Sequence, residues 1–341
     1  MKIGILTGGG DCPGLNGVIR AAVIEGTELG HEFIGFRDGW RGPLENDWEP
    51  LNVERVAEIL PLGGTILGTS RTNAGQPGRI EKIKENLTEL GVDALIPIGG
   101  EDTLGAATAL SQAGVRCVGV PKTIDNDLSG TDVTFGFTTA VEIATDSIDR
   151  LRTTSASHHR AIVAEVMGRH AGWIALHTGI ATSAVATLIP EVPFDLGEIA
   201  ERVKRRVDAR RDAIVVVAEG ALPREGTVSS DSNEVDEFGH VQVGGIASYV
   251  AAELEKLAGI ETRATVLGHV QRGGAPSAYD RVLTTRLGAA AARALDAGES
   301  GVMVALCGGA INTIPLAEAT GTLRTVPPEL LEQLGTVLKS M

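Results

Sequence analysis

Residues 94–105 read ALIPIGGEDTLG, a short apolar run that ends in two glycines and continues into an acidic pair. The run is long enough for one buried strand, and residues 104–113 have the spacing of a helix. The same succession of an apolar run, a polar turn and a helical pattern recurs nearly from end to end of the chain. This alternation is typical of parallel sheets covered by helices on both faces, so we predict an α/β fold.

The expected elements follow from the two periodicities. Strands are expected at residues 2–7, 31–36, 94–98, 116–120, 161–166, 213–218, 264–267 and 302–307, and helices at about 15–29, 80–90, 104–113, 139–152, 196–211 and 281–297. Residues 224–245 are polar without clear periodicity, and we interpret them as a surface excursion, with a hairpin as one form. No role is assigned to this insertion.

The bulk composition limits the classes of protein. A chain of 341 residues exceeds the usual size of a single core, which predicts two lobes packed across a cleft. The net charge of −14 argues against binding to nucleic acid or to an anionic membrane surface. No signal peptide and no apolar run of about 18 residues is evident, so a cytoplasmic protein is expected. Cys12, Cys117 and Cys307 lack metal-ligand spacing and are expected to be reduced thiols.

A glycine-rich loop, GGGDCPGLN at residues 8–16, follows the first expected strand and opens a helix. Backbone N–H groups at a helix N-terminus can bind phosphate, and Gly10 is a candidate contact. A tight strand-to-helix turn is an alternative. A dinucleotide fold with Asp38 as the ribose acid is another, although the glycine spacing is not GxGxxG.

PKTIDND, residues 121–127, combines a cation, a hydroxyl group and carboxylates directly after a strand. Asp125 could accept the proton of a sugar hydroxyl as its oxygen attacks phosphorus, and Lys122 could neutralise charge on the transferred group. The alternative is a network of Asx turns in which the acidic side chains only cap backbone amides.

Arginines flank several strand ends. Arg160 and Arg169 lie on either side of one strand, and their guanidinium groups could bind phosphate oxygens in pairs, although each could equally be in a surface ion pair. Glu219 could accept sugar hydroxyls or could simply lie at a helix terminus. The remaining candidates near strand ends and glycine turns are Arg71, Arg263, His269 and Arg272.

Seven blocks in order, GGGDCPGLN, GGTILGTSR, GGEDT, PKTIDND, VMGRHAGW, VAEG and TRATVLGHVQRGG, resemble the phosphofructokinase family over nearly the whole chain. The resemblance implies two Rossmann-like lobes with mostly parallel sheets and the active site in the cleft between them. Residues 1–136 and about 270–321 would bind the phosphoryl donor; residues 137–269 and about 322–341 would bind fructose 6-phosphate. The reaction implied is Mg²⁺-dependent transfer of a phosphoryl group to the 1-hydroxyl of fructose 6-phosphate.

The resemblance also implies a role for each matched residue. Asp125 would be the general base, with Thr123 beside it. Arg160 and Arg263 would reach the sugar phosphate from a neighbouring subunit, which implies a homodimer or homotetramer. The other implied contacts are His269 and Arg272 for the sugar phosphate, Met167, Gly168, Arg169 and Glu219 around the sugar and the transferred group, and Gly10 and Arg71 on the donor side. Glu101 takes the place of an aspartate associated with Mg²⁺.

Two positions bear on the donor. ATP-dependent bacterial members of the family carry glycine where this chain has Asp102 and Lys122, whereas pyrophosphate-dependent members carry Asp and Lys. Some ATP-using members share PKTIDND, so Asp102 carries most of the inference. A carboxylate there would repel the α-phosphate of ATP by about 1 to 4 kcal/mol, depending on the local dielectric. The resemblance therefore implies pyrophosphate as donor, and hence a readily reversible step usable in glycolysis and gluconeogenesis.

Regulation and competing functions follow from the same comparison of residues. Arg20 and Arg152 match an effector pocket of allosteric members, but Ile24 and Val185 replace an arginine and a glutamate there, so no strong regulation by ADP or phosphoenolpyruvate is expected.

The rival function within the family is that of an ATP-dependent enzyme. A nicotinamide-dependent dehydrogenase would need a GxGxxG turn, and a non-catalytic phosphosugar sensor would not explain why Lys122 and Asp125 share one loop.

Overall fold

The computed structural model describes residues 1–224 and 245–340. The excursion expected at residues 224–245 therefore lies, apart from its two end residues, outside the described part of the chain. Contacts divide the chain into two compact units. Unit 1 comprises Met1–Ile124, Leu128–Thr139 and Arg272–Leu323, and unit 2 comprises Asp125–Asp127, Ala140–Gln271 and Arg324–Met341. These boundaries differ by a few residues from the expected lobes, and they assign the short Asp125–Asp127 segment to unit 2.

Unit 1 is built on a seven-stranded sheet of order β11-β10-β5-β4-β1-β2-β3. The inner strands are parallel, whereas β3 and β11 each pair antiparallel at an edge. The inner strands are almost entirely buried, which explains their continuous apolar sequences. The strands are β1 (Lys2–Thr7), β2 (Glu32–Phe36), β3 (Trp48–Leu51), β4 (Ala94–Gly99), β5 (Arg116–Pro121), β10 (Val302–Cys307) and β11 (Ala310–Pro315).

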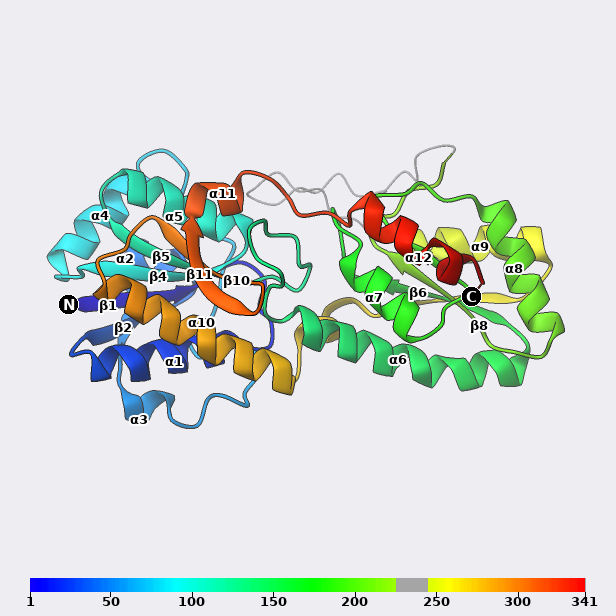
Figure 1. The fold of residues 1–341 in the computed structure, drawn as a ribbon, viewed down its shortest axis with the longest axis horizontal. Helices are drawn as coiled ribbons and strands as arrows, with labels where there is room; N and C mark the ends of the chain where they lie inside the picture. Colours follow the sequence, from blue (N-terminus) through cyan, green and yellow to red (C-terminus); the bar gives the residue numbers. More distant parts are fainter. Residues whose placement is uncertain (225–244, 341) are drawn as a thin grey trace. The chain divides into compact units, whose positions relative to one another are not determined.

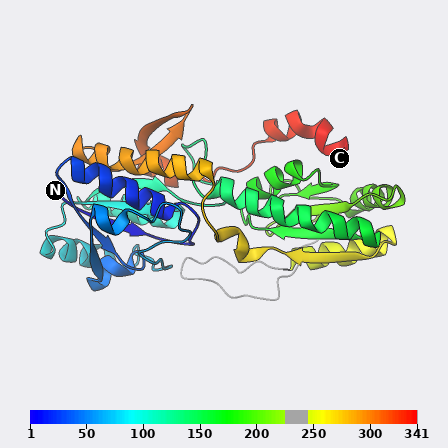
Figure 2. The same ribbon diagram turned by 90° about the horizontal axis from the view of Figure 1, so that it is seen from below.

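Helices cover both faces of this sheet. α1 (Leu15–Glu28) and α10 (Ala278–Asp296) pack side by side on one face, and α4 (Arg79–Glu89), α5 (Glu101–Gln112) and α11 (Leu316–Thr320) lie on the other (Figures 1 and 2). Close packing of α1 against α10 depends on Gly288, where a Cβ would come within 2.4 Å of the Val18 carbonyl oxygen. The short helices α2 (Arg41–Glu45) and α3 (Val53–Val56) complete the unit.

Unit 2 contains a four-stranded parallel sheet of order β7-β8-β6-β9. α8 and α9 share one apolar core cluster with this sheet, while α7 contacts β7 and β8. The strands are β6 (Ala161–Val166), β7 (Ala186–Leu188), β8 (Ala213–Ala218) and β9 (Thr262–Val266). The helices are α6 (Phe137–His158), α7 (Trp173–Ala181), α8 (Leu196–Asp208), α9 (Ile246–Ala258) and α12 (Pro328–Ser340), with a 3₁₀ helix η1 at Gly268–Arg272.

The predicted α/β class is confirmed, while helices α2, α3, α7, α9, α11 and α12 were not expected and several expected elements differ at their ends. α5 begins at Glu101 rather than near Leu104, because Gly100 supplies the extended residue before the helix and acidic side chains stabilise a first helical turn. Glu101 and Asp102 are therefore helical residues, not loop residues. β3, β7 and β11 were not expected, since they are short or lie at an edge. Within the described ranges, no helix is both long and apolar enough to cross a membrane.

Candidate active site

The carboxyl ends of three neighbouring strands bring the predicted donor residues together in unit 1. β1 pairs with β4 so that Thr7 lies opposite Ile98, and β4 pairs with β5 so that Gly99 lies opposite Pro121. The pairing extends beyond the strands, because Gly8 N donates to the Ile98 carbonyl at 2.9 Å and Lys122 N donates to that of Gly99 at 2.9 Å. The turns after β1, β4 and β5 are thus adjacent, where open α/β sheets bind ligands.

The glycine loop after β1 is held by the segment that carries Arg71. Gly9 has a φ of 77°, a left-handed conformation that favours glycine. Its N–H donates to the Ser70 carbonyl at 3.2 Å, and the hydroxyl of Thr69 donates to the Gly9 carbonyl at 2.6 Å. These bonds bring exposed Arg71 to the border of the loop.

Two cations converge on the same loop. The ammonium group of Lys122, a residue only 4% exposed, donates to the Gly10 carbonyl at 2.5 Å. Arg272 Nη1 donates to the Asp11 carbonyl at 3.3 Å, and a Cβ on Gly10 would lie 2.5 Å from that same Nη1 atom. The loop therefore carries the local positive charge that a phosphate would need on an acidic protein.

Glu101 and Asp102 lie exposed in the first turn of α5. The positive end of the helix dipole favours these carboxylates. In the parts of the chain that the structure describes, no group of three or more His, Cys, Asp or Glu residues could hold a metal ion. Mg²⁺ commonly binds one or two carboxylates together with water and substrate phosphates, and Glu101 fits that mode of binding.

Unit 2 brings Asp125, Arg169 and Glu219 into electrostatic contact. Burial and the neighbouring charge of Asp125 raise the pKa of Glu219 from 4.5 to about 7, although Arg169 opposes the shift. The backbone fixes this cluster, since Glu219 N donates to the Val166 carbonyl at 2.9 Å, joining the ends of β6 and β8. A carboxyl group whose pKa lies near neutrality, next to a second carboxylate and an arginine, is typical of a functional site.

The loop after β6 places Met167 and Gly168 beside this cluster. Gly168 has a φ of 132°, and a Cβ there would meet the Ala171 carbonyl oxygen at 2.7 Å, so the turn requires glycine. Met167 N donates to Oε1 of fully buried Gln271 at 3.2 Å. Gln271 was not among the predicted site residues, and the only sequence signal for it was its position between His269 and Arg272.

Arg160 and Arg263, predicted to share a phosphate, both contact Glu261. Arg160 Nη1 lies 3.3 Å from Glu261 Oε1, and Arg263 Nη2 lies 2.8 Å from the same atom. The register of β6 and β9 explains why both arginines reach Glu261. Ala161 pairs with Thr262 and Ile162 pairs with Arg263, so Arg160, directly before β6, lies beside Glu261, directly before β9. The Arg263 side chain is 58% exposed, so an anionic ligand could reach it, and His269 in η1 is also exposed.

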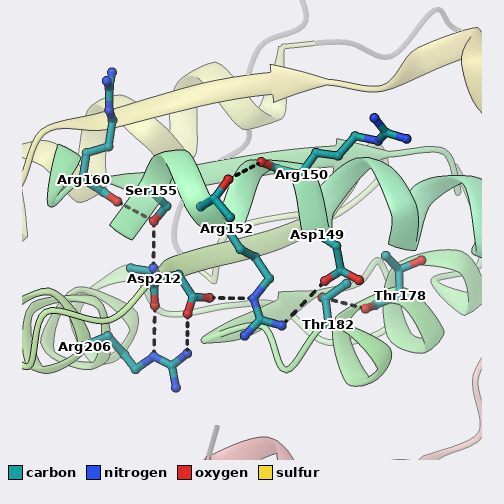
Figure 3. A network of polar contacts seen from close by, with 11 residues as sticks. Asp149, Arg150, Arg152, Ser155, Arg160, Thr178, Thr182, Arg206 and Asp212 are labelled. Carbon is teal, nitrogen blue, oxygen red and sulfur yellow. Dashed lines mark hydrogen bonds and ion pairs between the residues drawn. The ribbon is translucent and has the colours of Figure 1, made fainter. Parts of the chain in front are cut away.

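A second arginine cluster in unit 2 is internally neutralised. Arg152 Nε lies 3.1 Å from Asp212 Oδ2, and Arg206 Nη2 lies 3.5 Å from Asp212 Oδ1 (Figure 3). Arg160 joins this network through its backbone, whose carbonyl accepts the Ser155 hydroxyl at 2.7 Å and whose N–H donates to the Ser155 carbonyl at 3.2 Å, while its side chain points away (Figure 3).

The predicted residues thus separate by unit. Gly10, Arg71, Glu101, Asp102, Lys122, Thr123 and Arg272 belong to unit 1, and Asp125, Arg160, Met167, Gly168, Arg169, Glu219, Arg263 and His269 belong to unit 2. Thr123 accepts the Thr134 hydroxyl at its carbonyl at 2.7 Å. Arg272, expected at the sugar phosphate, has its described contacts with the glycine loop of unit 1.

A glycine loop and two cations at the carboxyl ends of parallel strands are typical of a phosphate-binding α/β protein. The sequence pattern described as "Phosphofructokinase" matches residues 2–295. The chain belongs to the phosphofructokinase family, whose members are phosphotransferases.

Relatives with two different donors in their names resemble this chain over its whole length. A pyrophosphate–fructose 6-phosphate 1-phosphotransferase of Streptomyces coelicolor is 58% identical over 98% of this chain and 99% of its own. ATP-dependent 6-phosphofructokinase 3 of the same organism is 53% identical over 99% of this chain and 100% of its own. Among solved structures, Pichia pastoris phosphofructokinase in the T-state has a TM-score of 0.83 at 31% identity, covering 99% of this chain and 36% of that one.

Proposed function

We propose that the protein transfers a phosphoryl group reversibly from pyrophosphate to the 1-hydroxyl of fructose 6-phosphate, giving fructose 1,6-bisphosphate and phosphate. The observation that carries this proposal is that Asp102 and Lys122 follow the adjacent ends of β4 and β5. Lys122 N is bonded to Gly99, three residues before Asp102, and its ammonium group lies on the Gly10 carbonyl. Asp102 is an acid and Lys122 a buried cation, and the strands that they follow lie close in the sheet to β1, which leads into the glycine loop. This arrangement suits a short, highly charged donor.

The electrostatics favour pyrophosphate over ATP. An exposed carboxylate at Asp102 would repel the α-phosphate of ATP, a third phosphate that pyrophosphate lacks. Lys122 would stabilise the charge that develops on the transferred group. The 58% identical relative named for pyrophosphate supports the same donor.

In the proposed chemistry Asp125 accepts the proton of the 1-hydroxyl while the sugar oxygen forms a bond to phosphorus. The bond between that phosphorus and the bridging oxygen of pyrophosphate breaks, and inorganic phosphate leaves. Arg169 would neutralise charge beside the reacting group, and Met167, Gly168 and Glu219 would orient the sugar. Thr123 lies two residues before the proposed base, Asp125, in the same PKTIDND motif. Arg160, Arg263, His269 and Arg272 would bind the sugar phosphate.

Mg²⁺, when bound, would neutralise charge on the donor phosphates. Glu101 is the residue that would hold it, with water and phosphate oxygens as the other ligands. The exposed position of Glu101 in the first turn of α5 leaves room for such a shared coordination sphere.

The proposal includes a homodimer or homotetramer in which Arg160 and Arg263 serve the site of a neighbouring subunit. It also includes weak or absent allosteric control, because Arg152 is engaged by Asp212 and Asp149. We place the enzyme in the cytoplasm, where glycolysis and gluconeogenesis would use it and where cysteines remain thiols. Burial raises the pKa of Cys12 and of Cys117 to about 12, so neither thiol ionises at neutral pH.

A donor comparison with the purified protein tests the proposal. We expect turnover of fructose 6-phosphate with pyrophosphate and Mg²⁺, turnover of fructose 1,6-bisphosphate with phosphate in reverse, and little turnover with ATP. Turnover with ATP alone would overturn the proposed donor and favour the alternative that the 53% identical ATP-dependent relative supports. Turnover with neither would overturn the catalytic function.

A further inference from the structure

The residues after β11 pair with the segment that follows Asp125. Ser129 donates its hydroxyl to the Thr322 carbonyl at 2.6 Å, and Leu128 forms an antiparallel bridge with Leu323. The pairing continues where Arg324 N donates to the Asp127 carbonyl at 2.8 Å. The chain between α11 and α12 therefore lies along the segment that follows the proposed base.

The side chain of Arg324 extends this pairing one residue closer to Asp125. Its Nη1 donates to the Asn126 carbonyl at 3.3 Å. Asn126 is buried and has a φ of 55°, an uncommon conformation for a residue other than glycine. Such a backbone persists where surrounding contacts determine it, and a cationic donor on its carbonyl is one of those contacts.

Arg324 is itself held by Trp173, the first residue of α7. The guanidinium carbon lies 4.5 Å from the centre of the Trp173 ring, and the indole N–H donates to the Arg324 carbonyl at 2.9 Å. Trp173 is only 5% exposed, so it forms a fixed platform. Next to it, Glu191 Oε1 accepts Gly172 N at 3.0 Å and Val326 N at 2.9 Å, which ties the same two segments together again.

We propose that Arg324 is a positioning residue: its guanidinium group, stacked on Trp173, fixes the Asn126 carbonyl and so orients the neighbouring Asp125 carboxylate for proton transfer. The kinetic part of this inference rests on the proposed function, while the structural part does not. Arg324 needs no contact with substrate for this role. Its loss should therefore affect the chemical step more than substrate binding, since small misplacements of a reacting group can cost about 100-fold in rate.

The test uses Arg324→Met, which keeps the apolar stem and removes the donors, and Arg324→Lys, which keeps a cation. Hydrogen–deuterium exchange of the peptide spanning residues 122–128 should be about 10-fold faster in Arg324→Met, with exchange in β5 unchanged. The matched control is Arg206→Met, since Arg206 is another partly buried arginine of unit 2 and its contacts are with Asp212. Unchanged exchange at 122–128 in Arg324→Met would overturn the proposal, whether or not the enzyme is active.

Kinetics provide the second readout. With pyrophosphate we expect kcat of Arg324→Met to fall roughly 10- to 100-fold while KM for fructose 6-phosphate changes less than about 3-fold, and Arg324→Lys should recover part of kcat. If Arg324 had a purely structural role, Arg324→Met would lower the amount of folded enzyme without lowering kcat more than it changes KM. The control Arg206→Met should likewise show no separate effect on kcat. Faster exchange with normal kcat would overturn the positioning role. If the wild type turns over neither donor, the proposed function fails, and exchange alone decides whether Arg324 fixes the segment.

Discussion

Under the proposed function, Asp102 would combine a structural and a selective role in one carboxylate. As the second residue of α5 it benefits from the positive end of the helix dipole, so the acid stabilises the element that carries it. The same charge would repel an anion that approaches the end of β4. A glycine at this position would remove the repulsion and would weaken the first turn of the helix at the same time.

We expect Asp102→Gly to raise kcat/KM with ATP about 10-fold or more, because one charge repulsion of about 1.4 kcal/mol corresponds to that factor. Asp102→Asn separates charge from size, and it should give a smaller gain in the same direction. Steady-state kinetics with ATP and with pyrophosphate measure both effects. If Asp102→Asn used ATP no better than the wild type while Asp102→Gly did, the barrier would be steric rather than electrostatic.

Glu219 makes stability depend on pH. The pKa of Glu219 is about 7 in the folded protein, against an ordinary value of 4.5. The contribution of this group to stability is therefore fully present below pH 4.5 and is lost as the pH rises through about 7. Glu219→Gln has no such proton to lose. The difference in Tm between Glu219→Gln and the wild type should therefore grow in favour of the variant from about pH 5 to pH 8. A difference that stays constant with pH would contradict the raised pKa.

At this scale the sequence was informative about chemistry and uninformative about contacts. Lys122 and Asp125 could be singled out because a cation and an acid after a strand are unusual for a turn. The stacking of Arg324 on Trp173 joins residues 151 positions apart, and no local pattern indicates it. Gln271 likewise appears important only once its side-chain oxygen Oε1 is seen to accept the Met167 N–H.

The start of α6 depends on a residue from another helix. Asp280, fully buried near the start of α10, accepts the N–H groups of Gly136 at 3.1 Å and of Thr139 at 3.0 Å. It also accepts the hydroxyl of Thr139 at 2.5 Å. One carboxylate thus satisfies amides at the N-terminus of α6, close to the boundary between the two units at residues 139 and 140.

Asp280→Asn should lower the free energy of unfolding by about 2 kcal/mol, because an amide offers one acceptor oxygen where the carboxylate offers two and leaves a buried N–H group without a partner. Denaturant titration measures the change. Asp208→Asn, at an exposed acid at the end of α8, is the matched control and should have little effect. Equal stability of the two variants would show that Asp280 does not hold the helix.

The elements with the strongest patterns were predictable, whereas the helices α7, α9 and α12 were not expected. β1, β6, β8 and β10 begin and end at the expected residues. Short edge strands such as β3, which contains Pro50, owe their existence to a neighbouring strand rather than to their own sequence. The early start of α5 depended on the extended conformation of Gly100, which a single sequence does not reveal.

At the scale of the whole molecule, composition predicted a chain too long for one core, and the structure has two compact units with separate sheets. What composition could not predict is that Asp125–Asp127 belongs with unit 2 although its neighbours on both sides belong to unit 1. That assignment depends on pairing with the chain near Arg324. It also means that the proposed base belongs to the same unit as Arg160 and Arg263, whereas Arg272 belongs to unit 1. The proposal that Arg160 and Arg263 serve a neighbouring subunit therefore raises a question that experiment can answer: which subunit's Arg263 acts with which base.

Mixing two inactive variants answers that question. Asp125→Ala should lack the base, and Arg263→Ala, which leaves Glu261 paired only with Arg160, should bind fructose 6-phosphate weakly. If Arg263 serves the neighbouring subunit, a hybrid dimer holds one site with both residues and one with neither, so an equal mixture recovers about a quarter of wild-type activity. If both residues serve their own subunit, no hybrid site is intact. Co-expression, with size-exclusion chromatography to verify assembly, should therefore restore turnover that neither variant has alone, and persistent inactivity of assembled hybrids would refute the shared site.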